Sequence, residues 1–470
     1  MILFCALTGF AQEKQTDSTD NRNGWKFFRA TDKQEALFTH QEKLNWKLEF
    51  ADGSVQALTE LERTDDHIIM QNNGSKLIYR LTAGRGYWRT PGSEPDDWKT
   101  WVKGEWVQVP ISPIKSSSKD YVIKLGYFVP QDRQPIPNYD RKIRVIMNIV
   151  AELYRDDLLE KGYDSGGFQF ELQEDEQPTV HLIKGNRTAG YYNNSPAYEA
   201  NEQWKRLVPE IRDELGSTDD QVLVVFAETY DNGPADHGWP GSIALGSYYT
   251  ADGGLGIYTS HILKDAFCAL SLDEQRKKFF DRTPVAGRRA IGHSMNSPRC
   301  EFVEDGIGAV AHELGHAFGL PHDRRQDDIY IMGNGFRNLR QNFTASKRKK
   351  AQFSDDNARL LMSSRYLNPD LDRTDNTAAE VDLKLVVEGR MTLYADLTLK
   401  DDKGLRALVL TDTIEGTIVE GQELSGKETT LRVKLNKVAL RDGEVKVMAI
   451  VTDTGGNQTR VTRSLKVPAR

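Results

Sequence analysis

The most informative run in this chain is His312-Glu313-Leu314-Gly315-His316-Ala317-Phe318-Gly319-Leu320-Pro321-His322-Asp323. Residues four positions apart share one face of an α-helix, so His312 and His316 can turn two imidazoles towards one point. Gly319 can adopt a positive φ, end the helix and turn the chain back. His322 follows three residues later and can bring a third imidazole to the same point. The stretch therefore predicts a helix, a sharp turn and a cluster of three histidines.

Three converging imidazoles are the donor set of a catalytic zinc site, in which the fourth position stays open. Glu313 neighbours His312 and can face that position, where a carboxylate can take a proton from a water acidified by the metal. With 9 His in 470 residues, a chance match to the full pattern has a probability on the order of 10⁻⁵. The helix also has an apolar side, as a buried active-site helix requires: Ile307, Val310, Ala311, Leu314, Ala317 and Phe318.

The motif resembles that of the metzincin clan of zinc endopeptidases. A second mark is Tyr330-Ile331-Met332-Gly333-Asn334-Gly335, which looks like the Met-turn of that clan. The resemblance implies that His312, His316 and His322 bind zinc and that Glu313 is the general base. It also implies that the Met332 side chain forms a hydrophobic floor beneath the metal and is not a ligand.

The branch of the clan stays open. Asp323, directly after the third histidine, is similar to the reprolysins, whereas the short gap before Met332 looks more like the matrixins. Astacins and serralysins carry a tyrosine two residues after the methionine, and Asn334 stands there in this chain. No such tyrosine is therefore assigned.

The resemblance implies an α+β catalytic domain, expected at residues 119–368, with a twisted mixed sheet, backing helices, the zinc helix and the Met-turn. The hydrophobic pattern agrees with this order of elements. It predicts helices near 138–161 and 197–215, with strands at 166–172 and near 179–183 between them, and then a continuous apolar strand at 221–227. In the family, the edge strand of the sheet pairs with the substrate backbone. Residues 242–249 are the favoured edge strand, and 336–343 are the expected S1′ wall.

Two β-rich regions flank this domain. Strict alternation and Asn-Gly or Asp-Gly turns predict an N-terminal antiparallel β domain at 24–112, as a propeptide or an accessory domain. Residues 378–470 alternate in the same way and predict a β-sandwich of about seven strands. Asp453-Thr454-Gly455-Gly456-Asn457 resembles the D-x-x-G-N turn of bacterial immunoglobulin-like modules. Such modules are expected to space or attach a catalytic domain.

The composition places further bounds on function. A net charge of −7 argues against nucleic acid as a main partner. The apolar run at 2–10 predicts a signal peptide at 1–11 and secretion to the periplasm or the outside, followed by a disordered leader at 12–23. No other segment is long and apolar enough to be transmembrane.

Several residues outside the motif leave alternatives open. Cys268 and Cys300 either pair or stay as two buried thiols, and residues 12–120 hold no cysteine that could cap the zinc. A second, structural zinc ion could use Asp236-His237 and His261, but their spacing matches no family pattern. Asp-rich turns could bind calcium, although no loop matches a known calcium motif.

Together these observations predict a secreted, zinc-dependent endopeptidase that acts on protein or peptide substrates. One alternative is a catalytically silent zinc-binding protein that adheres or binds through its β domains. The other is a different zinc hydrolase, such as an amidase, against which the third histidine and the Met-turn weigh. Subsite preference, activation and oligomeric state do not follow from the sequence.

Overall fold

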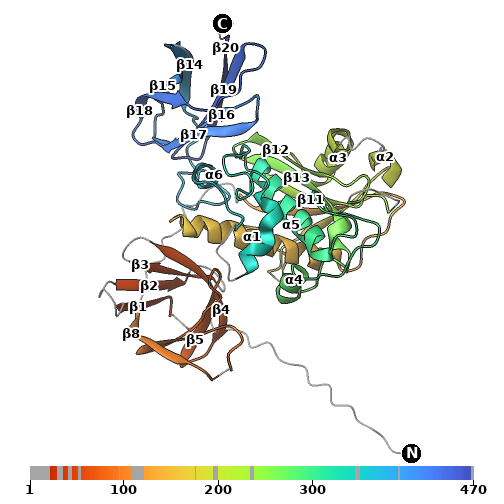
Figure 1. Cartoon of the computed structure of the whole chain (residues 1–470), viewed down its shortest axis with the longest axis vertical. Helices are drawn as coiled ribbons and strands as arrows, with labels where there is room; N and C mark the ends of the chain where they lie inside the picture. The colour runs from red at the N-terminus through yellow and green to blue at the C-terminus, as the bar shows by residue number, and fades with distance from the viewer. Residues whose placement is uncertain are drawn as a thin grey trace, which may run out of the picture. The chain divides into compact units, whose positions relative to one another are not determined.

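The computed structural model describes residues 22–28, 35–40, 45–50, 54–94, 96–107, 121–174, 176–193, 200–232, 238–344, 350–389 and 392–466. Contacts within the chain divide it into two units, residues 1–112 and 113–470 (Figure 1). The predicted signal peptide and most of the leader lie outside the described residues. None of the helices in the described part is long and apolar enough to cross a membrane.

The first unit contains an eight-stranded closed antiparallel barrel. Alternating apolar side chains fill its interior, with Trp25, Phe38, Trp46 and Leu48 fully buried. Trp101 packs on Phe27 with ring centroids 4.7 Å apart, so this tryptophan serves the barrel core. An antiparallel β domain was predicted here. Its strands are β1 (Gly24–Phe28), β2 (Glu35–His40), β3 (Asn45–Phe50), β4 (Val55–Arg63), β5 (His67–Asn72), β6 (Ile78–Thr82), β7 (Arg85–Arg89) and β8 (Lys99–Val107).

The second unit is built on a five-stranded mixed sheet in the order β10-β9-β11-β13-β12. Four strands run parallel: β9 (Ile123–Val129), β10 (Val180–Lys184), β11 (Val222–Ala227) and β13 (Gly253–Thr259). The fifth strand, β12 (Ala244–Thr250), is antiparallel to β13 and forms one edge of the sheet, as expected for 242–249. A strand expected at 166–172 is absent. Only isolated bridges form there, because Gly167 has a φ of +71° and interrupts the extended run.

Helices cover both faces of this sheet (Figure 1). On β11, Val222, Val224 and Phe226 share a core with α1 (Tyr139–Glu160) and α5 (Arg299–Ala317). The alternate residues of β11 face α3 (Ala200–Leu215). Because β11 is buried on both faces, its sequence is an unbroken apolar run. The remaining helices are α2 (Ala189–Asn193), η1 (Ser260–Leu263), α4 (Leu272–Lys278), η2 (Gly335–Phe343) and α6 (Asp355–Leu361).

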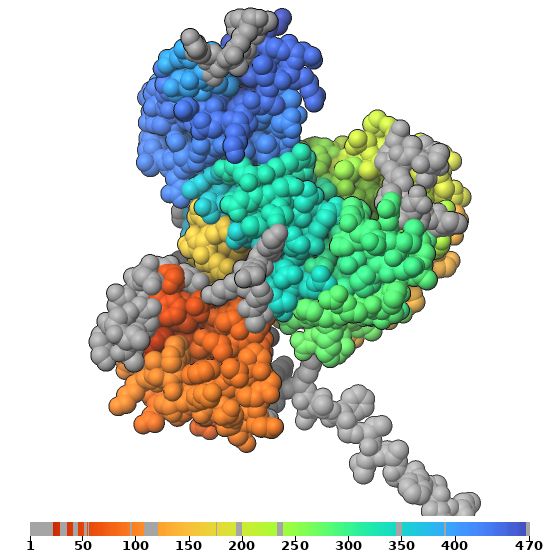
Figure 2. All heavy atoms as spheres, in the orientation of Figure 1, coloured from red at the N-terminus to blue at the C-terminus, as the bar shows by residue number. Residues whose placement is uncertain are grey.

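Residues beyond 379 form a sandwich of seven strands, the number expected. One sheet has the order β14-β15-β18 and the other β17-β16-β19-β20. Val409, Ile418 and Ile450 of the sandwich belong to the same hydrophobic core as α1 and α5. Figure 2 shows the sandwich, in blue, directly against the teal segment that follows α5. The strands are β14 (Glu380–Glu388), β15 (Thr392–Lys400), β16 (Leu405–Asp412), β17 (Thr417–Glu423), β18 (Glu428–Leu435), β19 (Glu444–Asp453) and β20 (Gln458–Lys466).

Candidate metal centre

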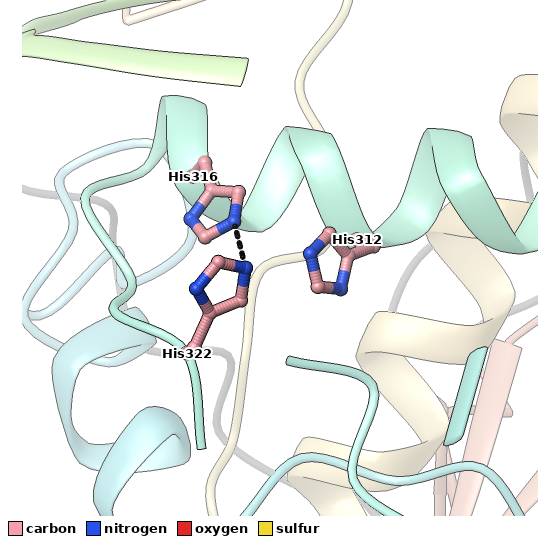
Figure 3. Close-up of side chains that lie close together, drawn as sticks. All are labelled: His312, His316 and His322. Atoms are coloured by element: carbon pink, nitrogen blue, oxygen red, sulfur yellow. Dashed lines mark hydrogen bonds between the residues drawn. The ribbon is translucent and has the colours of Figure 1, made fainter. Parts of the chain in front are cut away.

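The three motif histidines converge at the C-terminal end of α5 (Figure 3). His312 and His316 project from one face of the helix, and His322 faces them from the loop that follows. One ligand atom from each lies within 4.8 Å of the others, and the Nε2 atoms of His316 and His322 are 3.1 Å apart. Gly319 has a φ of +89°, which only glycine adopts readily, and this turn carries the chain back to the helix.

Backbone carbonyl groups orient the imidazoles. The Nδ1 atom of His312 lies 2.6 Å from the carbonyl oxygen of Ile331, and that of His316 lies 2.8 Å from the carbonyl oxygen of Leu320. The backbone of Gly416 hydrogen-bonds to His322. A carbonyl oxygen can only accept, so Nδ1 of His312 and of His316 carries the proton and Nε2 is left as a donor to a metal.

Burial makes the neutral imidazoles more stable than the charged ones. It lowers the pKa of His312 to about 3 and that of His316 to about 4, and it also lowers the pKa of His322. Three neutral nitrogens that face one point are the donor chemistry of zinc, with room for a fourth ligand. The residues present therefore fit a zinc ion.

Glu313 lies beside this cluster and is held by the edge strand of the sheet. One of its carboxylate oxygens accepts a hydrogen bond of 2.8 Å from the backbone N–H of Gly246 on β12. Burial raises the pKa of Glu313 to about 8, and the bond from Gly246 opposes that rise. The carboxyl group is thus positioned by a strand far from it in sequence, a contact that the motif itself does not predict.

Gly246 also allows α5 and β12 to approach closely. A Cβ atom at this position would lie 1.9 Å from the backbone oxygen of Glu313 and 2.9 Å from Cβ of His316. Gly246→Ala is therefore expected to destabilise the protein by about 3 kcal/mol or more, because the helix must move. The measurement is a thermal melt beside Gly190→Ala in α2, where an added Cβ meets nothing within 4 Å. An unchanged melting temperature for Gly246→Ala would contradict this packing.

Met332 packs beneath the motif helix. Its side chain is fully buried, and a Cβ atom at Gly315 would lie 2.5 Å from its sulfur. The backbone N–H of Asp323 donates to the carbonyl oxygen of Met332 over 2.9 Å. This bond joins the loop that carries His322 to the segment that carries Met332. The Met332 sulfur lies so close to Gly315 of α5 that a larger residue there would collide with it.

Two further predicted residues lie close to the cluster. The ring centroid of Phe336, at the start of η2, is 4.8 Å from that of His312. The carboxyl group of Asp323 is fully buried and accepts hydrogen bonds of 2.5 to 3.1 Å from Arg325. Arg325 also bonds to Asp356 of α6 over 2.6 Å. Asp323 therefore holds the loop behind His322.

The C-terminal sandwich contributes directly to this centre. The backbone N–H of Ile418 donates to the carbonyl oxygen of His322 over 2.9 Å, and the N–H of Arg324 donates to Thr417 Oγ1 over 2.9 Å. A guanidinium nitrogen of Arg460 on β20 donates to the carbonyl oxygen of Gly319 over 2.6 Å. Contacts between residues so distant along the chain leave no local sequence pattern. The sequence therefore predicted only a module that spaces or attaches the catalytic domain.

Arg460 also lies over the ring of Tyr248 on β12, 4.1 Å from its centroid. Arg460→Met keeps an apolar stem but loses these contacts and the hydrogen bond from Nε to Gln458, so we expect metal affinity and kcat/KM to fall about tenfold while the fold is retained. The matched control is Arg463→Met, an exposed position on the same strand. Equal metal affinity in the two variants would show that Arg460 does not support the loop that carries His322.

His261, the one described residue of the predicted second zinc site, does not join a metal cluster. His261 is buried and stacks on Trp239 with centroids 4.3 Å apart, and it belongs to neither possible metal cluster in the described part. Asp236 and His237, named for the same second zinc site, lie outside the described residues. Cys268 and Cys300 are both buried free thiols, which decides between the two alternatives left by the sequence.

Comparison with known proteins places this arrangement in a wider context. Residues 114–368 match the model of a family described as "Putative peptidase family". A search of curated protein sequences finds no match.

Solved structures with a similar fold include OgpA from Akkermansia muciniphila. The catalytically inactive form, in complex with an O-glycopeptide substrate called glycodrosocin, has a TM-score of 0.51 and 15% identity, covering 76% of this chain and 95% of that chain. Wild-type OgpA has a TM-score of 0.50 and 15% identity, covering 76% of this chain and 96% of that chain. Metalloproteinase-II from Bacteroides fragilis gives a TM-score of 0.25 and 11% identity, covering 64% and 85%, which is too distant to carry an argument. The likeness to OgpA is one of fold.

Proposed function

Since the chain belongs to this peptidase family, we propose that it is a secreted zinc metalloendopeptidase of the metzincin type. Family membership supports peptide hydrolysis by a metalloenzyme. The observation that carries the rest is the cluster of three imidazoles next to the partly buried carboxyl group of Glu313. Zinc, the role of Glu313, the clan, the immunoglobulin-like nature of the sandwich and secretion are parts of this proposal.

In the proposed mechanism, His312, His316 and His322 would hold the zinc ion. When bound, zinc polarises the scissile carbonyl group and acidifies a water molecule. Glu313 accepts the proton of the attacking water and then delivers it to the leaving amine. The N–H of Gly246 holds the Glu313 carboxyl group in place during both transfers. No covalent bond to the protein forms.

The substrate is proposed to be a peptide lying along β12. This strand forms one edge of the sheet, so an extended peptide can add to it by main-chain hydrogen bonds. Phe336, against His312, is the candidate wall of the S1′ pocket. The fold shared with OgpA, whose inactive form holds an O-glycopeptide, makes O-glycosylated peptides the first substrates to test.

The test is a metal analysis of the purified protein, followed by incubation with a peptide library in glycosylated and unmodified forms. We expect about one zinc per chain, and cleavage that a chelator abolishes and added zinc restores. Zinc without cleavage of either library would favour the silent binding protein. Release of ammonia or of an acyl group without peptide cleavage would favour the amidase. A chain that binds no zinc would contradict the proposal.

A further inference from the structure

A second cluster of possible metal ligands lies in the C-terminal sandwich, far from the histidines in sequence. Asp375 precedes β14, Asp401 lies between β15 and β16, and Asp453 ends β19. One carboxylate oxygen from each lies within 4.8 Å of the others. The exposed fractions of these residues are 3%, 8% and 0%. Three carboxyl groups from separate segments are thus gathered in the interior of the protein.

Backbone N–H groups fix one oxygen of each carboxyl group. Oδ1 of Asp401 accepts from Lys403 at 2.9 Å and from Gly404 at 2.6 Å. Oδ1 of Asp453 accepts from the N–H groups of Gly455 and Asn457, at 2.9 and 2.8 Å. Oδ1 of Asp375 accepts from Thr377 over 3.0 Å. The turns therefore hold the carboxyl groups rigidly before any ligand arrives.

The second oxygens are not satisfied in the same way. Oδ2 of Asp375 and Oδ2 of Asp401 are both buried, and neither has a hydrogen-bond partner among the described residues. The Asp375 side chain lies against the Asp453 turn, since a Cβ atom at Gly455 would lie 2.5 Å from its Cβ and 2.7 Å from its Oδ2. A buried carboxylate oxygen without a partner is costly, so a missing ligand is the simplest account of both.

The charge of the cluster is only partly offset by its surroundings. Arg365 is close by, but its guanidinium group donates to the backbone oxygens of Asp375 and Gly455, to Asn457 and to the carboxylate of Asp252. Within the described chain, no Lys or Arg side chain forms an ion pair with the three carboxyl groups. The three carboxylates lie close together in the interior and repel one another. A cation at the centre would relieve this repulsion.

We propose that Asp375, Asp401 and Asp453 bind a calcium ion that is distinct from the catalytic metal. The donors are all carboxylate oxygens, which suit calcium at 2.3–2.6 Å from each oxygen, whereas zinc prefers nitrogen and sulfur. Oxygens spaced up to 4.8 Å apart can reach one ion of this size. Magnesium would demand a stricter octahedron and keep several waters. The ion joins the linker before β14 to two turns of the sandwich that supports His322.

The test uses the full chain, stripped of metal and reloaded with one equivalent of zinc, and then titrated with calcium chloride. We expect calorimetry to find one calcium site per chain. At a calcium concentration 100-fold above the dissociation constant, the melting temperature should rise by about 5 °C. Absence of both binding heat and a thermal shift at 10 mM calcium, about tenfold above the dissociation constant of the weakest protein calcium sites, would overturn the proposal.

Asp401→Asn locates the site. Its amide oxygen can still accept from Lys403 and Gly404, so the turn should fold, while one negative charge is lost. We expect calcium affinity to fall at least about tenfold, with the calcium-free melting temperature unchanged or higher because repulsion is relieved. Asp402→Asn, at the exposed neighbouring residue, is the matched control and should bind calcium as the unmodified protein does.

Three outcomes distinguish the alternatives. An equal calcium response in Asp401→Asn and Asp402→Asn would place the ion elsewhere and overturn the assignment. No calcium response in either, with a melting temperature that rises on acidification, would mean that a shared proton satisfies the cluster. If Asp401→Asn does not fold, Asp375→Asn takes its place, because the N–H of Thr377 can bond to an amide oxygen equally well. None of these readouts depends on peptidase activity.

Discussion

Glu313→Gln is expected to lower kcat/KM by about 10³-fold while the protein keeps its metal. Glutamine has the same shape, and its amide oxygen can accept the 2.8 Å hydrogen bond from Gly246. It cannot take a proton from water at neutral pH, so only the proposed proton transfers are lost. The measurement combines kcat/KM on a cleaved library peptide, metal content and melting temperature for both proteins.

A matched control separates this effect from a general disturbance of α5. Glu301 lies in the first turn of the same helix and pairs with His293 at 3.1 Å, away from the cluster. Glu301→Gln should retain kcat/KM within about twofold, since a partly exposed ion pair contributes little. If Glu313→Gln kept more than a tenth of the activity, another group would have to be the base.

His316→Ala is expected to weaken zinc binding on the order of 10³-fold and to remove activity with it. The substitution deletes one of three nitrogen donors. It also leaves the carbonyl oxygen of Leu320 without its 2.8 Å partner, so the turn that places His322 should loosen. Metal content after dialysis and a zinc titration by calorimetry measure the loss. The melting temperature should differ from that of the unmodified protein mainly when zinc is present.

His293→Ala is the control for this variant. Its imidazole is partly exposed and pairs with Glu301, so its loss should leave zinc binding unchanged. Retention of one tightly held zinc per chain in His316→Ala would rule out the three-histidine assignment.

The sequence was most informative where the determining contacts are local. His312, His316 and the Gly319 turn lie within eight residues, so helical periodicity and one positive φ suffice to predict their placement. The apolar run of β11 likewise reports burial on both faces, and the structure confirms that strand and the helices α1 and α3. In each case the backbone conformation is set by residues close together in the sequence and by the burial of apolar side chains.

Only the tertiary structure decided the contacts that complete the centre. Gly246 reaches Glu313 because β12 folds onto β13 and α5 crosses both strands. Gly416 and Ile418 reach His322 because the sandwich shares a core with the catalytic part. Asp375, Asp401 and Asp453 meet because three separate turns close on one another.

These contacts join residues that are dozens of positions apart, through backbone groups or through side chains whose types are common on any surface. No periodicity marks them, since a backbone N–H group is present at nearly every residue and an aspartate in a turn is ordinary. Their chemistry arises only when chain closure buries them together. The proposed metal-binding residues and the principal elements could therefore be predicted from local sequence, whereas the packing of the sandwich on the second unit sets how those residues are held.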